Sequence, residues 1–277
     1  MATVIGPGRV GLALSRCCQK VYGNQPLMIG RGQQVPTHTL TPILVTTRNC
    51  SLQEVFRQTP KDLQADLVFF QNGFISPTLR EHGCADNTQV LLYLSASADG
   101  DTKDGKLTVA CGRWANETAR ILKAGGIACS VVGQEQFSIC QAKKLLWAAI
   151  FWVLCHGLGE KSVGHVAELH REEVRRLVAE LLPVALHLFA PESEGEPTAD
   201  GSAPGPNAEG LVGPVTDKLC EYSLSIGAAV PDKGMALEEF EWRNGPLLRA
   251  AATPLHVEWL KRASCPRSLI EAFAAGQ

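Results

Sequence analysis

Long apolar runs and an excess of positive charge are both missing from this chain of 277 residues. The longest apolar stretch, Leu145 to Cys155, has about half of the roughly 20 residues that a bilayer-spanning helix needs. Lysine and arginine number 26 against 28 aspartates and glutamates, so the net charge of -2 provides no basic field for a nucleic acid backbone. The sequence therefore predicts a soluble protein with no membrane span and no nucleic acid partner.

Paired cysteines and clusters of metal ligands are missing as well. No two cysteines have the C-x-x-C spacing, and no cysteines and histidines group at the spacing of a metal site. The ten cysteines lie scattered at Cys17, Cys18, Cys50, Cys84, Cys111, Cys129, Cys140, Cys155, Cys220 and Cys265. We therefore expect free, mostly buried thiols and no metal.

Free thiols are typical of a reducing compartment. The chain opens on an apolar strand at Ala2 to Ile5, with no charged leader or Arg/Ser-rich transit segment before it. A cytoplasmic location is the expectation, although a processed organelle protein would show the same features.

Motifs of several common kinds of catalysis are absent. The sequence has no G-x-S-x-G nucleophile elbow and no G-K-[ST] phosphate loop. His156, His165 and His170 follow no metal-binding motif. Serine hydrolysis, P-loop chemistry and metal-assisted hydrolysis are therefore not predicted.

The sequence does contain a change of pattern near residue 133. Up to that point short apolar runs alternate with amphipathic helical segments, which predicts a Rossmann-type α/β domain with a parallel sheet over residues 1–133. Residues 134–277 show helical spacing and predict an all-α domain. Within it, residues 191–210 are rich in Pro, Gly, Ser and acids, which predicts a flexible surface loop.

The first predicted strand and helix are joined by the hexapeptide GPGRVG. Its glycines fit the G-x-G-x-x-G pattern, which allows a tight turn, close approach of a pyrophosphate and close packing of helix on strand. The helix N-terminus would direct free N–H groups at the diphosphate. The alternative is a purely structural turn. The residues predicted to bind a dinucleotide here are Gly6, Pro7, Gly8, Arg9, Val10 and Gly11.

No acidic side chain precedes Glu54 in the chain. Arg31 lies 20 positions after Gly11, at the end of the second predicted strand. NAD binders usually place a carboxylate there for the ribose 2′-hydroxyl. A cation at this position favours the 2′-phosphate of NADP(H) over NAD(H), although Arg31 could instead be an ordinary solvated charge.

Several further motifs resemble the ketopantoate reductase family, within the 6-phosphogluconate dehydrogenase-like superfamily. They follow the family's order along nearly the whole chain: the glycine turn, QNG at 71–73, TVACG at 108–112, AGGI at 124–127, AKKLL at 142–146 and EEFEWRNG at 238–245. The resemblance implies an NADP(H)-dependent oxidoreductase with a helical substrate and dimerisation domain, and hence a homodimer.

The resemblance also implies roles for single residues. Lys144 matches a lysine that protonates the substrate carbonyl as a general acid, with Lys143 as the alternative register. Glu239 matches a glutamate that contacts the substrate and helps to organise the lysine, and a carboxylate there would keep the ammonium charged. Asn72 matches an asparagine beside the nicotinamide, and Arg48 falls near the adenosine end. From spacing alone, the lysines and the acidic run would be ordinary solvated helix residues.

Some positions depart from the family's pattern. Ala148 and Trp152 stand where asparagines are usual, one and two turns after the predicted catalytic lysine. Because unmatched polar groups are costly to bury, this predicts a bulkier or less polar substrate than ketopantoate. Gly227 stands where a serine is expected, with Ser223 and Ser225 as the nearest candidates.

The segment after Arg31 departs as well. Ten residues separate it from the run PILVTT, which starts at Pro42. The family has room there for another strand, so we expect the sheet to lack one element. Glu180 resembles another acid of the family, but its charged neighbours predict an exposed helix face, and we leave it out of the site.

The expectation is an NADPH-dependent reductase that converts a 2-keto acid or related carbonyl compound into the hydroxy product. Two alternatives stay open. One is a non-catalytic NADP(H)-binding relative that acts as a sensor or interaction protein, which the altered substrate-facing helix supports. The other is a hydroxyacid dehydrogenase of a neighbouring family, which shares the two-domain plan and the lysine.

Overall fold

The computed structural model describes residues 2–96, 102–190 and 208–275. The chain divides into two compact units, Met1–Phe137 and Ser138–Gln277. The predicted boundary, after residue 133, lies four residues before this division. The first unit contains strands and helices, whereas the described part of the second is helical.

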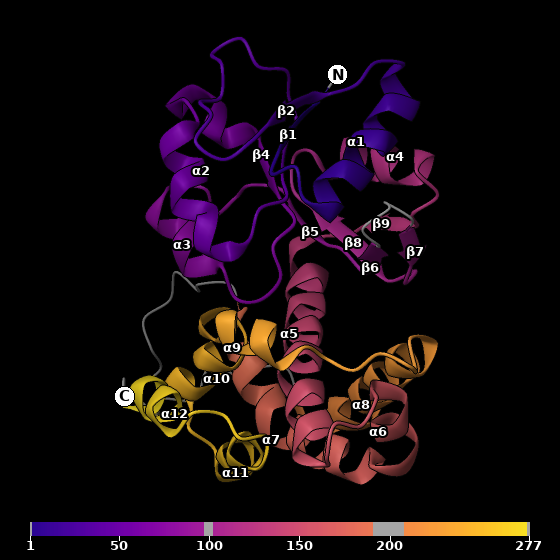
Figure 1. The fold of residues 1–277 in the computed structure, drawn as a ribbon, viewed down its shortest axis with the longest axis vertical. Helices are drawn as coiled ribbons and strands as arrows, with labels where there is room; N and C mark the ends of the chain where they lie inside the picture. The colour runs from indigo at the N-terminus through magenta and orange to yellow at the C-terminus, as the bar shows by residue number, and fades with distance from the viewer. Residues whose placement is uncertain (1, 97–101, 191–207, 276–277) are drawn as a thin grey trace. The chain divides into compact units, whose positions relative to one another are not determined.

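The first unit is built on a seven-stranded sheet in the order β2-β1-β3-β4-β5-β8-β9 (Figure 1). Its strands are β1 (Thr3–Ile5), β2 (Leu27–Ile29), β3 (Ile43–Val45), β4 (Leu67–Phe69), β5 (Gln89–Leu91), β8 (Thr108–Cys111) and β9 (Cys129–Val131). The first five pair in parallel, and β1, β3 and β4 are buried throughout, as in parallel sheets that helices cover on both faces. The Rossmann-type α/β fold class is confirmed.

The last two strands run against the other five. β8 pairs antiparallel with β5 and parallel with β9. A parallel return from β5 would need a crossover, usually a helix. The described part of this connection instead forms a small antiparallel pair, β6 (Leu94–Ala96) with β7 (Thr102–Asp104). The sheet is therefore parallel in its main part only, and its last two strands differ from the prediction.

Helices lie on both faces of this sheet (Figure 1). On one face α1 (Arg9–Tyr22) packs against α4 (Ala115–Ala124). The other face carries α2 (Leu52–Gln58) and α3 (Ser76–Glu81), with the short turns η1 (Asn49–Ser51) and η2 (Lys61–Asp66) before and between them. This is the layered arrangement that alternating strands and helices predict.

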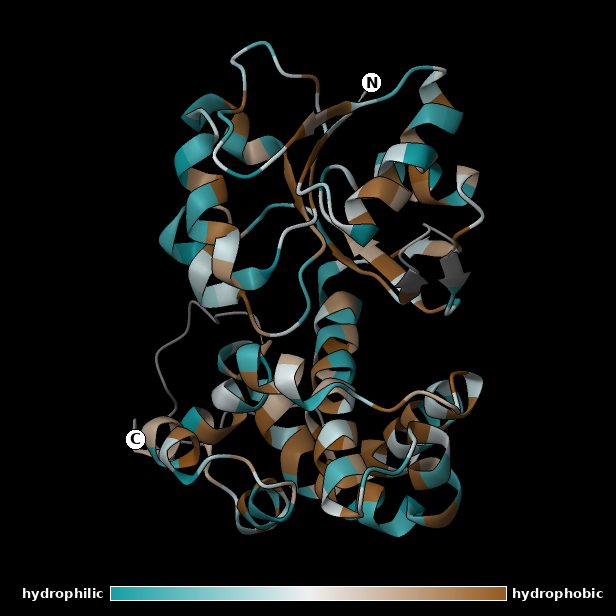
Figure 2. Ribbon diagram, viewed as in Figure 1, coloured by the Kyte–Doolittle hydropathy of each residue, from teal (hydrophilic) through white to brown (hydrophobic). Residues whose placement is uncertain are grey.

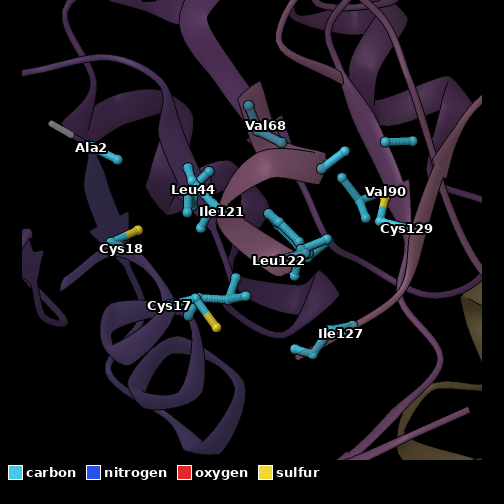
Figure 3. Close-up of a cluster of buried hydrophobic side chains, with 14 of the residues drawn as sticks. Ala2, Cys17, Cys18, Leu44, Val68, Val90, Ile121, Leu122, Ile127 and Cys129 are labelled. Carbon is cyan, nitrogen blue, oxygen red and sulfur yellow. The ribbon is translucent and has the colours of Figure 1, made fainter. Parts of the chain in front are cut away.

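The apolar core of the first unit lies between α1, α4 and the sheet (Figure 3). Leu14 and Cys18 of α1, Leu44 and Val68 of the central strands and Leu122 of α4 are fully buried. Burial of a leucine or valine side chain stabilises a fold by about 1.5–3 kcal/mol. Figure 2 shows the same strands as hydrophobic. This packing fixes α1 against β1 and so fixes the glycine turn between them.

No helix or strand forms between β2 and β3, where residues 30–42 make turns. Dinucleotide-binding sheets usually carry a further strand beyond this one. Here β2 is the edge strand. The expectation that the sheet lacks one element is confirmed, and Arg31 follows directly on this edge.

The second unit consists of packed helices over the residues described. They are α5 (Gln134–Gly157), α6 (Val163–Leu169), α7 (Arg171–Leu188), α8 (Ala208–Ser225), α9 (Lys233–Glu238), η3 (Phe240–Trp242), α10 (Asn244–Ala250), α11 (Pro254–Arg262) and α12 (Arg267–Ala274). The all-α prediction is confirmed. Residues 191–207 of the predicted loop lie outside the described residues, and residues 208–210 begin α8 instead of continuing a loop.

Helix α5 is apolar enough and long enough to cross a membrane by composition alone. However, 61% of its most apolar window is buried inside the structure. Leu146, Phe151 and Leu154 are each at most 1% exposed. A helix that is apolar on all sides belongs in a core. We therefore interpret α5 as the core helix of the second unit.

Candidate functional site

The glycine turn between β1 and α1 uses each of its glycines differently. Gly6 has a φ of +98°, which favours glycine. A Cβ on Gly11 would lie 2.0 Å from the carbonyl oxygen of Gly6 and 2.8 Å from Thr46 Oγ1, so the close packing of α1 requires glycine. A Cβ on Gly8 would meet nothing within 4 Å. Gly8 is therefore the position whose open side can receive a ligand.

A cavity of about 620 Å³ opens at the carboxyl ends of β1, β2 and β3. Open α/β sheets bind their ligands at this end of the strands, and the volume falls in the ordinary range for small-molecule sites. Predicted cofactor residues in its lining are Gly6, Pro7, Gly8, Arg31 and Arg48. Arg9, Val10, Gly11 and Asn72 were also predicted to bind the cofactor but lie outside the lining.

Three arginines line this cavity: Arg31 after β2, Arg48 after β3 and Arg57 in α2. Sequence reasoning missed Arg57, because it considered the arginines within the segment that has no acidic residue, and Glu54 ends that segment three residues before Arg57. Glu54 lines the cavity too, with its Oε2 3.0 Å from Arg57 Nη2, and Gln58 donates a hydrogen bond to its other oxygen. The single carboxylate among the described lining residues is thus engaged, and the cavity keeps a net positive charge.

The QNG segment is tied to the end of β3. The side-chain amide of Gln71 donates to the carbonyl oxygens of Val45 at 3.3 Å and Thr47 at 3.0 Å. Asn49 Nδ2 donates to the carbonyl oxygen of Asn72 at 2.7 Å. Asn72 itself is exposed. These bonds fix the backbone of the segment beside residues that line the cavity, and they leave the amide of Asn72 at the surface of the first unit.

Lys144 lies in α5 and is 8% exposed, whereas Lys143 is half-buried. Burial, and then the nearby charge of Arg243, lower the pKa of Lys144 from 10.5 to about 7. A lysine of this pKa can both donate and regain a proton near neutral pH. Sequence reasoning also missed Arg243, although it directly precedes the Asn-Gly pair of the EEFEWRNG motif.

Glu239 lies between α9 and η3 and pairs with Arg243. The two side chains are 20% and 17% exposed, and Glu239 Oε2 lies 2.5 Å from Arg243 Nη2. The expectation that Glu239 keeps Lys144 charged stays a prediction, since the contact that the structure gives for Glu239 is with Arg243 and the pKa of Lys144 falls. Burial and the charge of Arg243 set the proton equilibrium, and the carboxylate holds the arginine.

Trp152 is a core residue, not part of a substrate surface. Its side chain is 1% exposed, and its Nε1–H donates to Asn244 Oδ1 at 2.7 Å. Asn244 Nδ2 in turn donates to the carbonyl oxygen of Ala149 at 3.2 Å and to His256 Nε2 at 2.9 Å. The prediction that Trp152 reshapes the substrate pocket is therefore wrong. Ala148, which is half-buried, is the remaining change on this helix face.

The two serines near the expected carboxylate-binding position have other partners. Ser223 is fully buried, accepts from Trp147 Nε1 at 3.0 Å and donates to the carbonyl oxygen of Leu219 at 2.9 Å. Ser225 Oγ donates to the carbonyl oxygen of Tyr222 at 2.7 Å. Such back-bonding to a preceding helical carbonyl is common for serine in helices. Each hydroxyl proton is thus bonded within its own helix.

Glu180 has a structural role. Its carboxylate accepts hydrogen bonds from the backbone N–H of Leu255 at 3.2 Å and of His256 at 2.8 Å. These N–H groups belong to the first turn of α11, which lacks partners within its own helix. Glu180 therefore caps α11 from α7 and is half-buried, so the exposed helix face that its charged neighbours predicted is wrong for this residue.

The thiols follow the composition. All ten cysteines are free, and all except the exposed Cys50 and the half-buried Cys140 are buried. Burial raises the pKa of Cys18 and of Cys155 to about 12. The prediction of free, mostly buried thiols is confirmed. Over the described ranges, no three His, Cys, Asp or Glu side chains group as a metal site.

No family model and no curated protein matches this sequence. Solved structures do match its fold. A dimeric ketopantoate reductase from Staphylococcus aureus is 16% identical with a TM-score of 0.59, over 99% of this chain and 98% of that one.

Two further structures agree. A ketopantoate reductase from Ralstonia eutropha is 15% identical, with a TM-score of 0.60 and 99% of each chain covered. D-mandelate dehydrogenase, in a ternary structure with NADH and anilino(oxo)acetate, is 13% identical with a TM-score of 0.64, over 99% of each chain. The predicted resemblance is confirmed at the level of structure: along its whole length, this chain has the fold of the ketopantoate reductases.

Proposed function

We propose that this protein is an NADPH-dependent reductase that converts a 2-oxo acid into a 2-hydroxy acid. The observation that carries the proposal is Lys144, a buried lysine with a pKa of about 7 in a chain with this fold. Such a lysine suits general acid catalysis at neutral pH. The anilino(oxo)acetate bound by D-mandelate dehydrogenase carries a carbonyl next to a carboxylate, which supports this substrate class.

The cavity of the first unit fits the phosphates of a dinucleotide. Gly8 leaves room for a pyrophosphate, and no side chain caps the N–H groups at the start of α1. Arg31, Arg48 and Arg57 would hold a 2′-phosphate, because guanidinium groups pair well with phosphate. These cations support NADP(H) over NAD(H). D-mandelate dehydrogenase is described with NADH, so the preference for NADP(H) in this protein is argued from the three arginines and not from that structure.

The proposed reduction transfers a hydride and a proton to the substrate carbonyl group, and different groups supply them. Reduced nicotinamide, when bound, supplies the hydride for the carbonyl carbon. Lys144 in its ammonium form donates a proton to the carbonyl oxygen, which becomes the hydroxyl, and the amine regains a proton from solvent. Arg243 promotes the donation by repelling the ammonium. Glu239 acts by holding Arg243, and Asn72 is proposed to contact the nicotinamide.

Of the two alternatives, the non-catalytic one has lost part of its support. It depended on Ala148 and Trp152 as changes in the substrate site, and Trp152 is a hydrogen-bonded core residue. The likeness to D-mandelate dehydrogenase favours the second alternative, a neighbouring hydroxyacid dehydrogenase. Identification of the product and its stereochemistry separates that activity from a ketopantoate reductase-like one.

A screen of 2-oxo acids, with NADPH oxidation as the readout, tests the proposal. We expect Lys144→Met, which keeps the apolar stem, to lower kcat by about 100-fold or more, while NADPH affinity changes little. Lys143→Met is the matched control and should keep wild-type kcat. Fluorescence titration should show tighter binding of NADPH than of NADH. Equal or tighter NADH binding contradicts the cofactor assignment, and failure to bind either nucleotide contradicts the proposed function.

We further propose a homodimer, since the Staphylococcus aureus ketopantoate reductase is described as dimeric. The free cysteines support a cytoplasmic location, because free thiols are typical of a reducing compartment. Light scattering of the purified protein measures the mass of the assembly directly. A monomer over the accessible concentration range would contradict the dimer.

A further inference from the structure

Arg243 directly precedes Asn244, which is bonded to α5, the helix that bears Lys144. Lys144 and Trp152 are eight residues apart on this helix and so share a face. Asn244, next to Arg243 in sequence, is bonded to Trp152 Nε1 at 2.7 Å and to the carbonyl oxygen of Ala149 at 3.2 Å. These bonds position Arg243, and its charge is close enough to lower the pKa of Lys144.

The guanidinium of Arg243 has more donors than acceptors around it. Nη2 donates to Glu239 Oε2 at 2.5 Å. Nε is buried and donates to no acceptor among the described residues. A buried donor without an acceptor is destabilising, and the guanidinium fork matches a carboxylate with two parallel hydrogen bonds. The side chain keeps 17% of its surface exposed while Nε itself is closed to solvent, so a small ligand would approach through the exposed part of the side chain.

The charges of this cluster point to the same kind of ligand. Arg243 carries a positive charge at all relevant pH values, Lys144 adds one when it is protonated, and Glu239 is the carboxylate that pairs with Arg243. A poorly solvated charge is unfavourable unless it is paired. A ligand carboxylate would give the guanidinium of Arg243 a second negatively charged partner beside Glu239. It also weakens the repulsion of Lys144 by Arg243, and so favours the ammonium form that donates the proton.

The hydroxyl groups that could otherwise bind a carboxylate here are bonded elsewhere, since Ser223 and Ser225 each donate to a carbonyl oxygen of their own helix. We propose that Arg243 binds the carboxylate of the substrate and selects 2-oxo acids over neutral carbonyl compounds. This inference rests on the proposed function, because it concerns the substrate side of the same reaction.

Binding of oxamate and of its neutral counterpart oxamide tests the proposal without any turnover. Calorimetry on the full chain with NADPH present should show that Arg243→Gln weakens oxamate binding by about tenfold or more, because a charge-assisted bidentate pair is lost. Oxamide binding should stay nearly unchanged. Arg243→Lys should recover part of the oxamate affinity, since it restores the charge without the fork. For any 2-oxo acid substrate that is found, Arg243→Gln should raise the KM for the acid and leave the KM for the corresponding amide unchanged.

Arg175→Gln is the matched control. Arg175 pairs with Glu172 at 2.8 Å on α7 in the same unit, but both side chains are more than half exposed. It should leave oxamate binding unchanged. Equal losses for oxamate and oxamide would show that Arg243 only braces the site, and would overturn the proposal. Unchanged oxamate affinity, or a wild-type chain that does not bind oxamate, would also overturn it.

If Arg243→Gln does not fold, the test uses Arg243→Lys and compares its ratio of oxamate affinity to oxamide affinity with that of the wild type. We expect this ratio to be lower in Arg243→Lys, and an unchanged ratio overturns the proposal. Because oxamate needs no reduction, these outcomes are distinct from a failure of the proposed reductase activity, which appears as absent NADPH oxidation.

Discussion

At the scale of single residues, two effects act on Lys144 in the same direction. Removal from water disfavours its ammonium form, and the positive charge of Arg243 repels it. The pKa falls to about 7, which makes the buried ammonium a far stronger acid than an exposed lysine. Burial first, and the charge of Arg243 second, therefore set the pH at which the proposed proton donor is charged.

We expect kcat/KM to fall as pH rises through about 7, the pKa of Lys144. The sign follows from the role of the lysine, since only the ammonium donates, and a lowered pKa means that this form is lost at lower pH. The profile of kcat/KM on both sides of neutrality measures the transition. Lys143→Met should leave it in place. Arg243→Gln should move it to higher pH, and an unmoved transition would contradict the assignment to Lys144.

At the scale of elements, the turn from β1 into α1 has separate structural and binding positions. Gly11 packs against the backbone of Gly6, where no Cβ fits, and Gly8 has open space around it. The fixed packing of α1 on the sheet holds the turn from one side, and the cavity opens on the other. Stability and cofactor binding can therefore be changed independently within one hexapeptide.

We expect Gly11→Ala to destabilise the first unit by about 1–3 kcal/mol, because the added methyl overlaps backbone that cannot easily move. Gly8→Ala should cost about 1 kcal/mol or less, since only the helix start is affected, yet it should weaken NADPH binding. Urea denaturation and NADPH titration measure the two effects. If Gly11→Ala weakened NADPH binding and Gly8→Ala bound NADPH as the wild type does, the proposal that the ligand lies on the open side of Gly8 would be contradicted.

At the scale of the whole molecule, a buried polar network holds the helices of the second unit together. Trp152 of α5 donates to Asn244 of α10, which donates to His256 of α11, and Glu180 of α7 caps α11. Because Asn244 donates to Nε2, the neutral His256 carries its proton on Nδ1, which has no acceptor among the described residues. This network accepts the histidine only in its neutral form.

Acid should therefore unfold this unit through His256. Burial lowers its pKa from 6.5 to about 4, so its contribution is complete above pH 6.5 and is lost as pH falls toward 4. The loss is on the order of 3 kcal/mol. Urea denaturation followed by tryptophan fluorescence over this pH range measures it. His256→Gln should flatten the pH dependence, and His187→Gln, at an exposed site on α7, should not. Equal slopes in wild type and His256→Gln would contradict this account.

Much of the fold can be read from the sequence, because its signals are local. The strand, glycine turn and helix that open the chain follow from apolar spacing and from the glycines within a few residues of each other. The cation at Arg31 and the missing acids before Glu54 are equally local, and the missing strand after Arg31 follows from segment length. The direction of β8 is not local, since it depends on what the chain forms after β5.

The candidate site was determined by sequence only in part. Motif spacing was enough to place Gly6 and Gly8 in the predicted site, and the family resemblance added Lys144. Only the tertiary structure decided that Trp152 belongs to the core, that Glu239 pairs with Arg243, and that Arg57 lines the cavity of the first unit. Trp152 and Asn244 are 92 residues apart. Burial, pairing and pKa depend on which distant segments pack together, and no local pattern of residues carries that information.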